Sequence, residues 1–189
     1  MNLKVTVPGL RYCKAPKIYF LTFRQILRQS LGHFRNQLKY YLQRKNLETA
    51  EKPNLREKAS YFAANFQPLI DAGQLVLLDG EKENILPGVS VYISNGHTQG
   101  QQIVKVSDGT STLLYCGDVV PTSSHVRLPW LMGYDLHPLL LMEEKQKYLG
   151  QAADQSWYLF FEHDPYCDSA LIEKSGPDFA VKERFWLHG

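Results

Sequence analysis

The chain has 189 residues, of which 44% are hydrophobic, and its 21 Lys and Arg against 19 Asp and Glu give a net charge of +2 at pH 7. This length and composition suit one globular domain or part of a larger one, and they exclude a disordered or fibrous chain. Three cysteines without a Cys-x-x-Cys pair indicate neither a disulfide framework nor a cysteine zinc site. Because no apolar run is long enough to span a bilayer, we expect a cytoplasmic protein with no membrane partner.

The positive charge is concentrated near the N-terminus. Residues 1–58 hold 13 Lys and Arg and 3 Asp and Glu, which leaves 8 against 16 for the remainder. Residues 1–35 carry no acidic residue and show no clean hydrophobic period, so we treat them as an atypical basic segment. Such a segment could contact nucleic acid, a protein or an acidic membrane surface, or act as a transit peptide. A solvated extension is the simpler interpretation, and nucleic acid is therefore not the expected partner.

The next segment predicts one helix followed by a meander of strands. Asn54 as a cap, apolar residues at helical spacing and Gly73 as a stop predict a helix between them. Four short β-like runs follow, "QLVLLDG", "VSVYIS", "QQIVKVSDG" and "STLLYCGD". Asp108–Gly109 between the last two indicates a hairpin.

The C-terminal third predicts a helix, a buried strand and a helix-like tail. Residues 137–156 have a charged face, and Pro138 suits the first turn of a helix. The run "WYLFF" is continuously apolar, as expected of a strand that is covered on both faces.

A polar side chain follows each of three apolar runs. His97 comes after "VYIS", Asp118 after "LLYC" and His163 after "WYLFF". In layered α/β proteins such loops gather at one edge of the sheet. Two imidazoles and a carboxylate there would suit zinc, although each residue alone also has an ordinary explanation as a turn, capping or core residue.

Four motifs occur together in this order: "NGHTQGQQ", "LLYCGDVVPTSSHVRLPW", "MGYDLHPLLLMEEKQKYL" and "WYLFFEHDP". Together they resemble the C-terminal portion of metallo-β-lactamase-fold hydrolases, in the branch of lactonases and methyl-parathion-hydrolase-like proteins. The resemblance implies an α/β fold, a partial αββα sandwich with a mixed sheet flanked by helices, over residues 36–189. It also implies two zinc ions, which acidify a bound water to a pKa of about 7 for attack on an ester, lactone or phosphoester.

The resemblance assigns roles to four residues. His97 corresponds to a ligand of the first ion, Asp118 to the catalytic carboxylate that bridges both ions, and His163 to a ligand of the second ion. His125 could line the substrate cleft by its position, or lie on a surface loop. Zinc is the expected metal, although iron, manganese and cobalt also suit such ligands.

The family's first motif, His-x-His-x-Asp-His, is absent, because His33 is the sole histidine before His97. Four of the family's metal ligands are therefore missing. We expect a truncated or misjoined family member with weak or no activity, acting on a small-molecule substrate and able to self-associate through the exposed surface of a half sandwich. The alternative is a non-catalytic binding module that uses the basic segment to contact nucleic acid or a protein.

Overall fold

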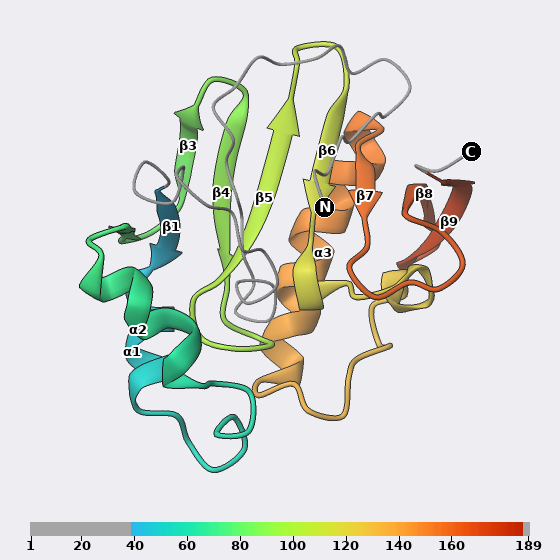
Figure 1. The fold of residues 1–189 in the computed structure, drawn as a ribbon. Helices are drawn as coiled ribbons and strands as arrows, with labels where there is room; N and C mark the ends of the chain where they lie inside the picture. The colour runs from blue at the N-terminus through green and yellow to red at the C-terminus, as the bar shows by residue number, and fades with distance from the viewer. Residues whose placement is uncertain (1–38, 187–189) are drawn as a thin grey trace. The chain divides into compact units, whose positions relative to one another are not determined.

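The computed structural model describes residues 39–186, which divide into two compact units, residues 39–80 and 81–186. Each unit has its own sheet (Figure 1). Each unit also has its own hydrophobic core. The basic segment 1–35 lies outside the described residues, so its boundary and its interpretation as a solvated extension stay predictions. None of the helices within residues 39–186 is long and apolar enough to cross a membrane.

The smaller unit is a two-stranded parallel sheet with two helices. Its elements are β1 (Tyr40–Gln43), α1 (Arg44–Glu51), α2 (Ala63–Asp71) and β2 (Leu75–Leu78). Leu47, Ala50 and Phe66 form its buried core. The predicted strand "QLVLLDG" is thus confirmed as β2, whereas β1 was not predicted.

The helix expected from Asn54 onwards is wrong in its first half, since α2 begins only at Ala63. The side-chain Oδ1 of Asn54 accepts hydrogen bonds from the backbone N–H groups of Arg56 and Glu57, and so closes a local turn rather than a helix. The predicted stop is confirmed, because Gly73 takes a positive φ of 62°.

The larger unit is a seven-stranded mixed sheet in the order β3-β4-β5-β6-β7-β8-β9. Its strands are β3 (Lys82–Leu86), β4 (Val89–Ser94), β5 (Gln101–Ser107), β6 (Thr112–Tyr115), β7 (Tyr158–Phe160), β8 (Ser169–Ser175) and β9 (Asp178–Phe185). Its helical segments are η3 (Gly117–Val119), η4 (Ser123–Val126) and α3 (Pro138–Gln155). The predicted α/β class with a mixed sheet is confirmed.

Strand direction places the ends of β4, β6 and β7 at one edge of this sheet. β4, β5 and β6 pair antiparallel in succession, so β4 and β6 run the same way, and β7 pairs parallel with β6. The predicted hairpin between β5 and β6 is confirmed, with Gly109 at a φ of 88° and Asp108 Oδ1 accepting from the N–H groups of Thr110 and Ser111.

Helix α3 makes the connection that a parallel pair requires, from β6 to β7. Its bounds and its Pro138 at the first turn confirm the prediction. One face of the helix buries Leu141, Tyr148, Leu149 and Ala152 against a core that includes Ile103, Leu114 and Leu159 from the sheet. The strand predicted from "WYLFF" is confirmed as β7, which has a hydrogen-bonded neighbour on each side, but its expected burial on both faces is only partial, because Leu159 is buried and Tyr158 and Phe160 are half-buried.

The expected helix-like tail is wrong, because residues 169–185 form the antiparallel hairpin of β8 and β9. Gly176 at a φ of 62° followed by Pro177 supplies the turn. β3 was also missed, since "KENIL" is mostly exposed at the sheet edge and has too few apolar residues to show an alternating pattern.

A buried lysine fastens α3 to the segment before it. The side chain of Lys145 is completely buried, and its Nζ donates to the backbone carbonyl oxygens of Arg127, Leu128 and Trp130 at 2.6, 3.2 and 2.9 Å. Burial lowers the pKa of Lys145 from 10.5 to about 8, so the ammonium is still the main form at pH 7. The ammonium group has three protons, so it can donate to each of these three carbonyl oxygens.

We expect Lys145→Met to lower the free energy of unfolding at pH 7 by about 2 kcal/mol or more, because it removes the donor from buried carbonyl oxygens. Wild type should also gain stability relative to Lys145→Met as the pH rises from 8 to 10.5. In that range the unfolded lysine binds a proton that the folded one has lost, which is worth up to about 3 kcal/mol.

Denaturant unfolding at several pH values measures both effects. The matched control is Lys147→Met on the same helix, whose exposed ion pair with Glu81 should contribute less than about 1 kcal/mol. Equal stability of the two variants across the pH range would contradict this role of Lys145.

Candidate metal centre

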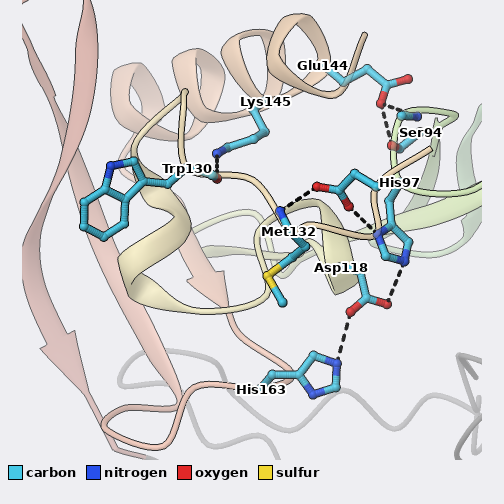
Figure 2. Close-up of polar contacts among 10 residues, drawn as sticks. Ser94, His97, Asp118, Trp130, Met132, Glu144, Lys145 and His163 are labelled. Atoms are coloured by element: carbon cyan, nitrogen blue, oxygen red, sulfur yellow. Dashed lines mark hydrogen bonds and ion pairs between the residues drawn. The ribbon is translucent and has the colours of Figure 1, made fainter. Parts of the chain in front are cut away.

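Three loops meet at the edge of the larger sheet where β4, β6 and β7 end. His97, Asp118 and His163 each follow three positions after the last residue of their strand. Asp118 Oδ2 lies 3.6 Å from His97 Nε2, and Asp118 Oδ1 lies 3.1 Å from His163 Nε2 (Figure 2). The structure therefore brings all three predicted residues together, with the carboxylate between the two imidazoles.

A buried carboxylate that the sequence analysis missed orients His97. Asp135 Oδ1 lies 2.7 Å from His97 Nδ1, and Asp135 Oδ2 accepts a hydrogen bond from the backbone N–H of Met132 at 2.7 Å. Because a carboxylate only accepts, this contact requires a proton on Nδ1. In neutral His97 the lone pair is then on Nε2, the atom that faces Asp118, and such outer-sphere carboxylates are typical partners of metal-binding histidines.

The loop that carries His97 is held by Glu144 of α3. Its carboxylate accepts hydrogen bonds from Ser94 Oγ and from the backbone N–H groups of Asn95 and Gly96 (Figure 2). A Cβ at Gly96 would come within 2.5 Å of the Leu141 backbone in α3, so glycine is needed for this approach. The N-terminal turn of α3 and the His97 loop therefore form one packed unit.

Asp118 and His163 are fixed by shorter local structures. Asp118 lies in the 3-10 helix η3, next to Gly117 at a φ of 52°. His163 donates its backbone N–H to the carbonyl oxygen of Pro121, and Asp164 accepts from the backbone N–H groups of Ser123, Tyr166 and Cys167. Burial of Asp164 opposes its ionisation, but these hydrogen bonds outweigh it and hold the pKa of Asp164 below its ordinary value.

Glu162 is a further acidic residue that the sequence analysis did not select. It precedes His163, and ligand atoms of Asp118, Glu162 and His163 all lie within 4.8 Å of one another. The Tyr115 hydroxyl donates to Glu162 Oε2 at 2.5 Å. The one sequence feature that could have identified Glu162 as a site residue is its position next to His163.

His125 is not joined to the cluster by any of the described contacts. It lies in η4, where its Nδ1 is 2.8 Å from Thr122 Oγ1, and burial lowers its pKa. Its role in binding substrate stays a prediction. The ring of Tyr134 lies edge-on to His97 with centroids 5.7 Å apart, and both Trp130 and Tyr134 are about half exposed.

The donor set fits a divalent transition metal. His97 Nε2 and His163 Nε2 supply nitrogen, and the carboxylates of Asp118 and Glu162 supply oxygen, which is the mixture that zinc accepts. The lone pair on Nε2 of neutral His97 faces Asp118 Oδ2 at 3.6 Å. A cation between these two atoms would bind both of them.

Comparisons with known proteins identify the family and similar folds. The family model of the metallo-β-lactamase superfamily matches residues 38–163. A probable metal-dependent hydrolase from Staphylococcus aureus superposes with a TM-score of 0.69 at 22% identity, over 79% of this chain and 52% of that one. AidC, a dizinc quorum-quenching lactonase in complex with a product, N-hexanoyl-L-homoserine, gives a TM-score of 0.62 at 19% identity, over 80% and 58%.

Hydrolase AbOPH of the β-lactamase superfamily gives a TM-score of 0.62 at 15% identity, over 76% of this chain and 54% of that one. The chain thus spans little more than half the length of these three structures. At such identities the likeness shows the fold alone. The search of curated proteins found no match.

We expect Asp135→Asn to release His97 from its fixed tautomer. Asparagine has one acceptor oxygen where Asp135 uses two, so either His97 Nδ1 or the Met132 N–H loses its partner, at about 1–3 kcal/mol of stability. Ring-nitrogen chemical shifts of His97 measure the tautomer, and exposed Asp154→Asn on α3 is the control. A His97 spectrum unchanged from wild type would contradict the orienting role.

We expect Gly96→Ala to destabilise the protein by about 1–3 kcal/mol, because the new methyl group overlaps the α3 backbone. Gly133→Ala is the matched control, since nothing lies within 4 Å of its added Cβ, and it should change stability by less than about 0.5 kcal/mol. Thermal unfolding compares the two. Equal melting temperatures would show that the His97 loop does not need this close approach.

Proposed function

The chain belongs to the metallo-β-lactamase superfamily, and from this membership we propose that it takes part in metal-dependent hydrolysis of an ester, lactone or phosphoester. The observation that carries the proposal is the position of Asp118 between His97 and His163, with one carboxylate oxygen toward each imidazole. Metal dependence is a property of the family, and the residues present here supply part of its ligand set.

The described residues would hold a metal on either side of Asp118. His97 Nε2 and Asp118 Oδ2 face one position, and His163 Nε2 and Asp118 Oδ1 face the other. A zinc ion supplies Lewis-acid chemistry, since it polarises the scissile carbonyl or phosphoryl group and acidifies water. Asp135 keeps the lone pair of His97 directed at this position, so the protein contributes preorganised donors.

Attack by water, rather than by a protein nucleophile, suits the residues near the site. Cys116 and Cys167 are buried, and burial raises the pKa of both thiols, that of Cys116 to about 12. A thiol that is protonated at neutral pH is a poor nucleophile. The two cysteines of the described part of the chain therefore offer no covalent route.

An apolar group on the substrate is favoured by the segment next to His97. This segment, residues 130–140, has four exposed apolar side chains: Trp130, Tyr134, Leu139 and Leu140. The ring of Tyr134 contacts His97. Exposed apolar side chains beside polar donors are typical of ligand sites. An acyl lactone or ester, such as the class whose product is bound in AidC, combines a polar scissile group with an apolar tail.

The proposal is tested by hydrolysis assays of the 189-residue chain with an acyl lactone, a phosphotriester and a thioester, with and without added zinc. We expect slow hydrolysis that requires metal, is abolished by a chelator and is lost in Asp118→Asn, while Asp154→Asn behaves as wild type. A complementary fragment carrying the family's His-x-His-x-Asp-His motif should raise both zinc content and rate, because it supplies donors that this chain lacks.

Two results would overturn the proposal. Hydrolysis that persists in the chelator or in Asp118→Asn would assign it to another site. No hydrolysis of any substrate by the chain or by the complemented chain would favour a binding module that keeps the scaffold without the chemistry.

A further inference from the structure

We infer that Glu162 is a metal ligand, so that the chain's own residues form one three-ligand site on the His163 side of Asp118 and bind a single divalent ion there. This inference rests on the proposed metal site and adds a ligand that the sequence resemblance does not assign. The His97 side has two facing donors among the described residues, His97 Nε2 and Asp118 Oδ2. The two sides are therefore unequal.

The spacing of the three side chains suits an ion. One ligand atom each from Asp118, Glu162 and His163 lies within 4.8 Å of the other two. Zinc sits about 2.0–2.2 Å from nitrogen and oxygen donors, so tetrahedral ligands are roughly 3.5 Å apart. A contraction of about 1 Å, within reach of side-chain rotation, would complete the site. Glu162 and His163 are adjacent in the chain, and η3 holds Asp118 close to them.

Tyr115 positions the Glu162 carboxylate. Its hydroxyl donates a hydrogen bond to Oε2 of Glu162. Hydrogen bonds of this kind orient metal-binding carboxylates and are worth about 10–100-fold in affinity. Tyr115 is the last residue of β6, and Asp118 lies on the loop that follows it, so one strand end supplies both the ligand and the residue that orients its neighbour.

Charge favours an ion at this position. Two carboxylates so close together repel each other when both are ionised, and a divalent cation between them offsets that repulsion. Carboxylate oxygen and imidazole nitrogen are both donors that zinc accepts, and a site with three protein ligands leaves a fourth position for water or substrate. The His97 side would need donors from outside the described residues to reach the same number.

The test is zinc binding to the 189-residue chain, measured by isothermal titration and by elemental analysis after dialysis. We expect close to one equivalent for wild type. Glu162→Gln, which keeps the shape but removes the charge and one acceptor, should weaken binding at least 10-fold, and Tyr115→Phe should weaken it by a smaller factor. Glu143→Gln, an exposed glutamate on α3, is the matched control and should bind as wild type.

Histidine variants assign the side of Asp118 on which the ion sits. His163→Ala should abolish most of the binding, and it should weaken zinc affinity more than His97→Ala does. The visible absorption spectrum of the cobalt-loaded chain should change more in Glu162→Gln than in His97→Ala. Circular dichroism confirms that each variant is folded.

Each outcome either supports or overturns the inference. Zinc affinity in Glu162→Gln equal to wild type, two ions bound with equal affinity, or no zinc binding to wild type would overturn it. If Glu162→Gln binds as wild type while Asp118→Asn does not, the proposed function survives and the role of Glu162 fails. If a single Glu162-dependent ion binds but no substrate is hydrolysed, the inference stands and the proposed function fails.

Discussion

The parallel pairing of β6 with β7 is the constraint on which the site depends. It is the one parallel contact in the seven-stranded sheet, and it makes β7 end at the same edge as β4 and β6. An antiparallel β7 would carry His163 to the opposite edge, away from Asp118. The long connection through α3 makes the parallel pairing feasible, and α3 in turn packs its apolar face against the sheet. The connection through α3 therefore determines both the packing of the core and the position of the site.

Two neighbouring residues of α3 convert this packing into fixed geometry. Glu144 accepts hydrogen bonds from the loop that leads to His97, and Lys145 donates to carbonyl oxygens of the segment before α3. The carboxylate of Glu144 thus accepts from backbone N–H groups, and the ammonium group of Lys145 donates to backbone carbonyl oxygens. Both are costly groups to bury, and they are stable here because each has several partners. Glu144 thereby holds the loop before His97 against α3, and Lys145 holds residues 127–130 against the same helix.

The sequence predicted the elements whose signal is local. The apolar runs of β4 to β7, the Asp108–Gly109 turn and Pro138 at the start of α3 each carry their own evidence within a few residues. The exposed edge strand β3 and the β8–β9 hairpin were missed, because an edge position or a short turn leaves little of the alternating pattern on which strand prediction relies. Asn54 was misassigned because the same side chain can cap a helix or close a turn.

The candidate site divides in the same way. His97, Asp118 and His163 could be found because each follows a recognisable strand end and lies within a motif that resembles the family. Asp135 and Glu144 could not be found, because Asp135 lies 38 positions from its partner His97 and Glu144 lies 50 positions from its partner Ser94. Only the folded chain brings these residues together.

Glu162 was adjacent to a predicted ligand, yet adjacent side chains on an extended chain point in different directions, so adjacency alone does not place both in one site. What sets its role is the contact with Tyr115 at the end of the neighbouring strand. Because Asp118 turns a separate oxygen to each histidine, a metal on the His163 side does not require one on the His97 side. The proposed single-ion site therefore needs ordered donors only on the His163 side of Asp118.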